Sequence, residues 1–286
     1  MIPKNRHNPV MATPRMRVHD GARQISFLIP VDFSASAYNS LTYALKLARA
    51  CSARIHLVHI TDVNELVESS NPFVINSMLT VMERKAKNCV TALRELIEDS
   101  GIEVLSHDAM IGNIDVLLQK KIKYLSPDLV IVGRENFRKS SITRLIRASL
   151  SPTLVVPSTT EPRLPESIAL CPGRSASPRT LLSSLKRITS AATELTPCLT
   201  SVNRGMEDMR ISVDNPRIHH YPKAEAMNTQ ALSSFAKAHS IDLLCTVPVY
   251  ASRLHRAMKL SRSCDLIFKL NMPVMIMQPD QGPFRT

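Results

Sequence analysis

The sequence contains no tryptophan, and aromatic residues make up 4% of its 286 positions. Proteins that hold single-stranded nucleic acid without sequence preference stack the bases on aromatic side chains, so this scarcity argues against such a platform. No apolar run approaches the roughly 18–20 residues of a membrane-spanning helix. The amino-terminal stretch is polar and proline-rich, with no apolar segment behind its charges, which is not the pattern of a secretory signal. We therefore expect a cytoplasmic protein without a membrane partner.

Metal and catalytic motifs are also missing. The six cysteines form no CxxC pair, none has a histidine at metal-ligand spacing, and we expect reduced thiols. His56 and His59 stand three apart on a predicted strand and so point to opposite faces, which excludes one shared metal. No GxSxG, GxxxxGK or HExxH sequence occurs. An absent motif does not exclude an enzyme, but nothing here argues for one beyond very weak ATP hydrolysis at most.

The net charge of +12 is unevenly distributed. Counting Lys and Arg against Asp and Glu gives +4 for residues 1–24, +1 for 25–162 and +7 for 163–286. This excess can attract an anionic partner, although a solvated basic surface is its commoner meaning. Residues 1–24 lack periodicity and carry three prolines, so we expect a disordered basic tail.

Between residues 25 and 157, short apolar runs alternate with helical patterns. Runs typical of strands buried on both faces are 25–31, 54–60, 103–107, 128–133 and 152–157. Helical spacing predicts helices over 36–51, 76–99 and 140–149, and one from Ile114 to Ile122. Apolar residues at helical spacing in the longest of these are Met78, Val81, Met82, Val90, Leu93 and Leu96. The alternation predicts an α/β fold with a doubly wound parallel sheet and right-handed crossovers.

The same plan repeats, in shortened form, after a turn-rich linker at 158–165. Ser175-Ala-Ser177 stands 141 positions after Ser34-Ala-Ser36, and Asp242 to Val247 matches Asp128 to Gly133 position for position. The strands predicted for this half are 167–172, 194–202, 217–221, 242–247 and 273–277. Helices are predicted around Leu181 to Ile188 and over 224–239 and 251–269, while a polar segment at 203–216 replaces the second long helix. We expect two domains, 25–157 and 166–278, and a tail at 279–286.

Five motifs follow one another at a consistent spacing in the first half. They are Ile29-Pro-Val-Asp-Phe-Ser34, Ile55-His-Leu-Val-His59, Gly112-Asn-Ile114, Asp128-Leu-Val-Ile-Val-Gly133 and Ser151-Pro-Thr-Leu-Val-Val156. In this order they resemble the universal stress protein family in its tandem form, well over 25–157 and weakly over 166–277. The resemblance implies two tandem five-stranded parallel sheets of the adenine nucleotide alpha hydrolase-like, Rossmann-like type. It also implies homo-oligomers or internal pairing of the two halves, suggested to run through their fifth strands.

Some members of that family bind ATP or AMP at the carboxyl ends of the first and fourth strands. They carry an Asp after strand one and, after strand four, Gly-x2-Gly-x9-Gly followed by Ser or Thr, because glycine lets backbone N–H groups approach phosphates. By resemblance, the nucleotide positions are Pro30, Val31, Asp32, Ile60, Gly112, Val132, Gly133 and Arg134.

The glycine motif is incomplete in both halves. The first half keeps Asp32 and Gly133, but Asn136 and Ile146 occupy the later glycine positions. Gly133 to Pro152 is 19 steps, where the matching Val247 to Pro273 is 26, so about two helical turns are missing from the first half. The residues at the matching positions of the second half are Gly173, Val247, Tyr250, Leu260 and Ser261. We expect no nucleotide in the second half.

Each candidate residue also has a plainer interpretation. Asp32 fits a helix-capping acid as well as a ribose or adenine ligand, and Gly112 and Gly133 fit turn glycines. Basic residues near these positions can hold phosphate by charge or form a solvated helix face, the commoner case. They are Arg134, Arg138, Lys139, Arg144 and Arg147 in the first half and Arg253, Arg256, Lys259 and Arg262 in the second.

Three hypotheses follow. The first is a non-catalytic stress-response protein that acts by binding an unknown protein partner or by dimer-type packing, with a degraded nucleotide site and no cofactor. The alternative is an ATP- or AMP-binding sensor that uses Asp32, Val132, Gly133 and the basic segment of the first domain only. A third is binding of anions or nucleic acid through the basic tail and helices, against which the few aromatics and the lack of a recognised motif count.

Overall fold

The computed structural model describes residues 24–62, 72–136, 138–171, 198–201, 219–220, 229–246 and 267–277. The elements of the first half are β1 (Ser26–Pro30), α1 (Ala35–Cys51), β2 (Arg54–Thr61), α2 (Pro72–Asp99), β3 (Val104–Ile111), α3 (Ile114–Leu125), β4 (Leu129–Gly133), α4 (Lys139–Ala148) and β5 (Thr153–Val156). Those described in the second half are β6 (Ser167–Cys171), β7 (Cys198–Ser201), β8 (His219–His220), α6 (Thr229–Ala238), β9 (Leu243–Thr246) and β10 (Val274–Ile276), with residues 267–269 also helical.

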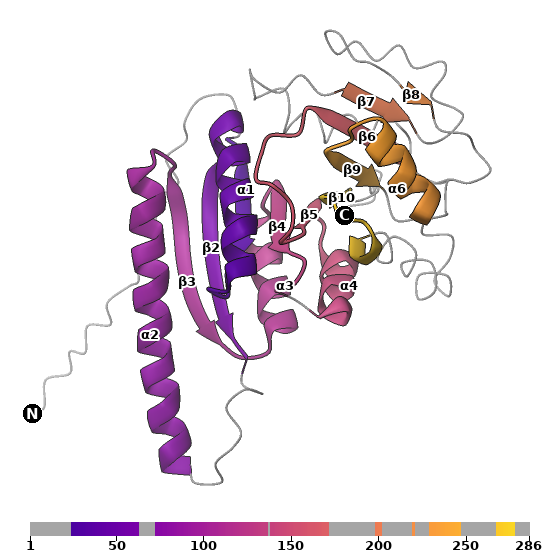
Figure 1. The fold of residues 1–286 in the computed structure, drawn as a ribbon. Helices are drawn as coiled ribbons and strands as arrows, with labels where there is room; N and C mark the ends of the chain where they lie inside the picture. Colours follow the sequence, from indigo (N-terminus) through magenta and orange to yellow (C-terminus); the bar gives the residue numbers. More distant parts are fainter. Residues whose placement is uncertain are drawn as a thin grey trace, which may run out of the picture.

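The strands form one continuous sheet in the order β3-β2-β1-β4-β5-β10-β9-β6-β7-β8 (Figure 1). Within each half the strands are parallel, and the second half repeats the strand order of the first. The halves meet through an antiparallel pair in which Val155 of β5 lies opposite Val274 of β10. The α/β class and the parallel sheet are as predicted, and the pairing through the fifth strands agrees with the arrangement that the family resemblance suggested.

Two apolar layers cover the sheet. One layer packs α1 and α2 on one face, through residues such as Leu41, Ala44 and Val90. The other packs α3, α4 and α6 on the opposite face, through residues such as Ile122 and Ile142. Strands between two layers bury both sets of alternating side chains, which is why β4 and β5 read as unbroken apolar runs in the sequence.

An acid before the fourth strand of each half has a structural role. The backbone N–H of Ser26 donates to Oδ2 of Asp128 (3.0 Å), and the N–H of Asp128 donates back to the carbonyl of Ser26 (2.9 Å). In the second half Ser167 and Asp242 exchange the same two bonds, at 3.1 and 2.8 Å. The repeat seen in the sequence therefore extends to individual hydrogen bonds that join the first and fourth strands.

Some predicted bounds differ from the structure. β3 continues to Ile111, well past the predicted end at residue 107, and α2 begins four residues earlier than residue 76. The apolar set predicted for α2 divides between two faces: Val90 and Leu93 are buried, whereas Val81 and Leu96 are largely exposed. Predictions for residues 1–23, for 203–216, for the helix around 181–188, for 251–266 and for the carboxyl-terminal tail lie outside the described residues.

Candidate functional site

The carboxyl ends of β1 and β4 lie side by side at the point where the strand order changes direction. The chain proceeds from β1 through β2 to β3 on one side, and β4 and β5 lie on the other. In open α/β sheets this switch point is where ligands bind. The structure places Val31, Val132 and Gly133 here, buried, and Asp32 beside them, exposed.

Asp32 organises the start of α1. Its Oδ1 accepts hydrogen bonds from the backbone N–H of Ser34 (2.9 Å) and from the Ser34 hydroxyl (2.6 Å). The same hydroxyl oxygen accepts from the N–H of Ala37 (3.1 Å), which makes Ser34 the amino-terminal cap of the helix. Phe33 between them has a φ of 61°, in the left-handed region, so the turn is tightly specified. The structure thus makes Ser34 the helix cap and gives Asp32 the role of holding that cap in place, while the Asp32 carboxylate stays in contact with solvent.

His59 supports the same turn from β2. Its Nδ1 lies 2.8 Å from the carbonyl oxygen of Val31, and its Nε2 lies 3.0 Å from the hydroxyl of Thr61. A carbonyl only accepts, so Nδ1 carries a proton. The ring also contacts Phe33, with 4.8 Å between centroids. The spacing of His59 in the sequence does not indicate this supporting role, which depends on a contact between β2 and the residue that follows β1.

Asn136 occupies the space in front of Gly133. A Cβ placed on Gly133 would lie 2.8 Å from Oδ1, 2.9 Å from Cγ and 3.0 Å from Nδ2 of Asn136. The two shorter distances lie below those that real Cβ atoms show, and the third is tight, so the missing side chain of Gly133 is what makes room for the amide. The close approach that the glycine allows is used by a residue of the chain itself.

The amide of Asn136 is only partly satisfied. Its Oδ1 lies 3.5 Å from the Ser34 hydroxyl, but the single proton of that hydroxyl points to Asp32 at the shorter distance of 2.6 Å. Nδ2 is buried and has no hydrogen-bond partner in the part of the chain that the structure describes. Packing against Gly133 therefore contributes more to the position of this side chain than hydrogen bonds do.

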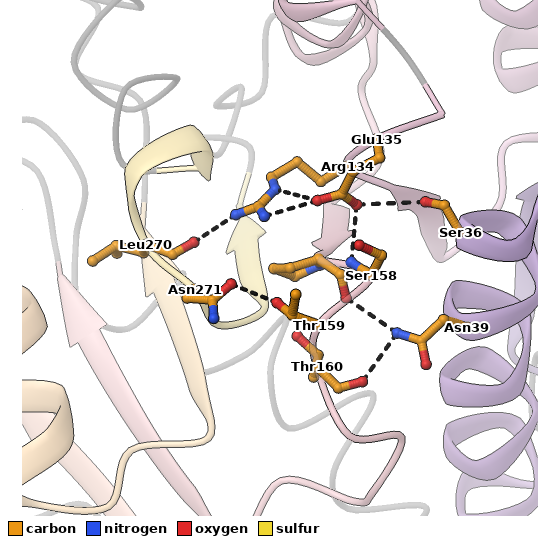
Figure 2. Close-up of polar contacts among 10 residues, drawn as sticks. Ser36, Asn39, Arg134, Glu135, Ser158, Thr159, Thr160, Leu270 and Asn271 are labelled. Atoms are coloured by element: carbon orange, nitrogen blue, oxygen red, sulfur yellow. Dashed lines mark hydrogen bonds and ion pairs between the residues drawn. The ribbon is translucent and has the colours of Figure 1, made fainter.

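Arg134 joins the site to the second half. Its Nε and Nη2 lie 2.8 Å from Oε1 of Glu135, and its Nη1 donates to the carbonyl oxygen of Leu270 at 2.8 Å (Figure 2). Leu270 directly follows helical residues 267–269, and carbonyls at a helix end attract a cation. The guanidinium is mostly buried, with 17% of the side chain exposed. The predicted phosphate ligand is therefore committed to an ion pair and to a contact between the halves.

Glu135 binds the segment after β5 and the start of α1. Its Oε2 accepts from the backbone N–H of Ser158 (2.9 Å) and from the hydroxyl of Ser36 (3.4 Å), as Figure 2 shows. Burial alone would raise the pKa of this carboxyl, but the Ser158 N–H and the Arg134 guanidinium together lower it. A carboxylate here adds negative charge beside the switch point, which is unfavourable for a phosphate.

Asn39 and the linker complete the contact between the halves. The Asn39 amide donates to the carbonyls of Pro157 (3.1 Å) and Thr160 (3.0 Å), which ties the chain after β5 to α1. Thr159 donates from its hydroxyl to Oδ1 of Asn271 at 2.5 Å, a contact drawn in Figure 2. The start of the linker is thus bonded to both halves.

Three other basic residues described after β4 do not converge on Gly133. Lys139 lies 5.6 Å above the ring of Phe268, in a cation–π contact. Arg144 forms an ion pair with Asp115 of α3, and Arg138 is exposed at the start of α4. The side chain of Arg147 and the second-half residues Arg253, Arg256, Lys259 and Arg262 lie outside the described part of the chain.

The remaining candidates stand at strand and helix ends. Gly112 has a φ of 152°, and a Cβ on it would meet Leu117 at 2.8 Å, so its backbone and its surroundings both favour glycine. Ile60 packs at the rim of the apolar layer beneath α3. Pro30 ends β1 opposite Val58. These contacts are structural and involve no free polar group.

A second polar cluster lies on β2 and β3. Nδ1 of His56 is 2.8 Å from the hydroxyl of Ser106, and burial lowers the pKa of His56, helped by the charge of Arg54. Nearby, Lys121 of α3 pairs with Asp108 at 2.8 Å. No group of three metal-ligating side chains occurs among the residues described, and no helix there is long and apolar enough to cross a membrane.

Comparison with known proteins agrees with this architecture. A model of the Universal stress protein family matches residues 26–157. The chain is similar in fold to a universal stress protein from Archaeoglobus fulgidus DSM 4304, with a TM-score of 0.65, 14% identity, and coverage of 90% of this chain and 97% of that chain. A functionally unknown protein from Pseudomonas aeruginosa PAO1 gives 0.60 and 14%, over 89% of this chain and 92% of that one.

More distant likenesses add nothing about ligands. A universal stress protein family protein from Arabidopsis thaliana with AMP bound has a TM-score of 0.37 and 14% identity, over 46% of this chain and 91% of that chain, which is too low to carry an argument. No curated protein sequence matches the chain. The residues matched by the family model include the strands whose ends form the site, and the two structures of similar length cover about nine tenths of the chain. Residues 26–157 of this chain therefore form a domain of the universal stress protein family.

Proposed function

We propose that this protein acts in a stress response by binding a partner, without catalysis, and that the nucleotide site of its first half is closed by its own side chains. The observation that carries the proposal is the amide of Asn136, which packs within 2.8–3.0 Å of the position of a Cβ on Gly133. A phosphate cradled by backbone N–H groups would need that same space.

Contacts around the site support the closed state. The segment after β4 is held by the bond from Arg134 to Leu270 and by the bond from Ser158 to Glu135. Opening the segment would break both and would leave a mostly buried guanidinium without its acceptors, which is costly. The carboxylate of Glu135 also disfavours an anion close by.

We extend the proposal to the second half as a shortened, degenerate copy of the same domain, over 166–278. The strand order β8-β7-β6-β9-β10 and the bonds between Ser167 and Asp242 support it. Its role would be to pair with the first half through β10 and to cover the segment at 134–136.

A second candidate is binding of ATP or AMP by the first half alone. The exposed carboxylate of Asp32 favours it, since Oδ1 accepts both bonds from Ser34 and Oδ2 accepts no hydrogen bond from the residues that the structure describes. A rotation of the Asn136 side chain would then be needed to admit the phosphates.

Calorimetry of the purified full chain with ATP and with AMP separates the two candidates. We expect no binding heat at high protein concentration. Heat that disappears in Asp32→Ala would support the sensor and refute the closed site. Heat that survives Asp32→Ala would place the nucleotide elsewhere. Binding to a DNA duplex at low salt, where phosphate contacts are strongest, would revive the nucleic-acid hypothesis, and its absence would end it.

A further inference from the structure

Helix α2 carries two apolar stripes on different faces. The first packs on the sheet through Ala86, Val90, Leu93 and Ile97, all buried. The second runs about a third of a turn away, with members three or four residues apart, the spacing of neighbours along one helix face. Its members are Val74, Met78, Val81, Lys85, Cys89, Ala92 and Leu96. We call this set the outer stripe.

The outer stripe faces solvent. Leu96 is 67% exposed, Val81 65%, Met78 48% and Val74 43%. Helix α2 lies at the outer side of the molecule, over β3 at the end of the sheet (Figure 1). Single exposed apolar residues are ordinary, but five in one line with the half-buried Cys89, over about 33 Å of helix and interrupted only by Lys85, form a surface of the kind that binds other helices. In the described part of the chain no element packs on this stripe.

The centre of the outer stripe is basic. Lys85 is its only charged member and is exposed, and Arg84, also exposed, lies about 100° around the helix from it. The nearby charges are already used within the helix, since Glu83 pairs with Lys87 at 2.6 Å and Glu98 with Arg94 at 3.0 Å. Among the residues that the structure describes, no acid pairs with Lys85 or Arg84. A partner that covers the apolar positions would have to neutralise the positive charge of Lys85.

A second copy of the chain, packed so that the two outer stripes cover each other, does not neutralise the charge of Lys85. Two α2 helices packed antiparallel on their outer stripes would set Val74 opposite Leu96 and Lys85 opposite Lys85, and like charges at a partly desolvated centre repel. The chain also carries a net charge of +12, which opposes self-association further.

We propose that the outer stripe of α2 binds an amphipathic helix of another protein, one whose apolar stripe carries an acidic residue at the position that meets Lys85. The apolar positions supply affinity by burial, and the Lys–acid pair sets register and selects the partner. This inference rests on the partner-binding function proposed above and names the chemistry of the partner. Nucleotide calorimetry does not involve α2, so either idea can fail without the other.

The test uses two synthetic helices of about 22 residues, the length of the stripe. Both carry apolar residues at alternating spacings of three and four, with one central Glu in the first and one central Lys in the second. Fluorescence anisotropy with the full chain should give an affinity for the Glu peptide about tenfold above that for the Lys peptide. Lys85→Glu should reverse this preference.

Two further variants locate the binding surface. Val81→Lys and Leu96→Lys alter exposed positions on the outer stripe and should each weaken binding of the Glu peptide by about tenfold or more. The matched control is Thr80→Lys, an exposed position on the side of α2 away from the stripe, which should bind as the wild type does. Circular dichroism checks that all variants stay folded.

Equal affinity for the Glu and Lys peptides would overturn the proposal, as would no binding of either at tens of micromolar protein. Binding that Val81→Lys leaves intact would also overturn it. Sedimentation of the chain alone supplies the remaining outcome: a dimer that Val81→Lys dissociates would assign the outer stripe to a second copy instead.

Discussion

Placing alanine at position 133 tests the packing of Asn136 directly. The φ of Gly133 lies outside the left-handed region, so the backbone itself accepts alanine. At such a site Gly→Ala normally stabilises a protein by about 0.4–1 kcal/mol, because it restricts the unfolded chain. Here the new methyl group would lie 2.8–3.0 Å from three atoms of the Asn136 side chain. Overpacking of a filled site costs about 1–3 kcal/mol. We expect Gly133→Ala to lower the free energy of unfolding by up to about 2.5 kcal/mol, the difference of these two effects, and by least where the Asn136 amide can rotate away from the methyl group.

A second substitution isolates the contact. Asn136→Ala removes all three atoms that the methyl group would meet, so Gly133→Ala in that background should raise the free energy of unfolding by about 0.4–1 kcal/mol. The two substitutions would then be coupled by about 1–3 kcal/mol, as expected for residues in contact. Asn39→Ala is the matched control: it is the same chemical change at a nearby amide that bonds Pro157 and Thr160, and it should be additive with Gly133→Ala.

Urea unfolding followed by circular dichroism measures these differences, provided that the dependence on urea concentration stays the same among the variants. The reasoning is refuted if Gly133→Ala has the same effect with and without Asn136. In that case the amide does not fill the space in front of Gly133, and the closed nucleotide site loses its main support.

Two other predictions concern the polar contacts. Arg134→Ala should lower the free energy of unfolding by about 1.5–3 kcal/mol, because it removes a mostly buried guanidinium and leaves the Glu135 carboxylate and the Leu270 carbonyl without their donor. Arg134→Lys should restore only part of this stability, since an ammonium cannot make both contacts in the same geometry. Urea unfolding of both variants measures the loss, and equal stability of wild type and Arg134→Ala would contradict the prediction. Burial lowers the pKa of His56 below 6.5, with Arg54 and Lys121 acting in the same direction and Asp108 against it, so the unfolded chain binds a proton first as the pH falls. The contribution of neutral His56 to the free energy of unfolding is therefore present above pH 6.5 and is lost as the pH falls below it. The wild type should lose more stability than His56→Gln between about pH 7.5 and 5.5. Parallel losses in the two proteins would show that His56 does not titrate in this way.

The strands could be predicted from the sequence because burial on both faces leaves an unbroken apolar run, as in 128–133. β3 was predicted too short because it is an edge strand, and the polar residues His107 and Asp108 in it look like the start of a loop. The apolar set predicted for α2 likewise contains residues of both its buried face and its outer stripe. Periodicity alone does not say which of two neighbouring apolar faces packs on the sheet.

The site was predictable in position but not in its contacts. Asp32, Gly133 and Arg134 lie at the ends of β1 and β4, which the predicted topology alone brings together. The acceptor of Arg134 is Leu270, 136 residues away, and no local pattern indicates it. The sequence shows that Asn136 stands at the second glycine position of the motif. Only the backbone path after β4 shows that the amide of Asn136 packs against Gly133.

Joining the halves on one chain makes their pairing independent of dilution. The ladder between β5 and β10 is short, with Thr153, Leu154 and Val155 opposite Ile276, Met275 and Val274. Between separate chains, so short a ladder would dissociate as the protein became scarce. A linker of a few residues instead holds the second half at an effective concentration on the order of millimolar, whatever the number of molecules in the cell. The contact of Arg134 with Leu270 is then a fixed property of each molecule and cannot report how much of the protein is present.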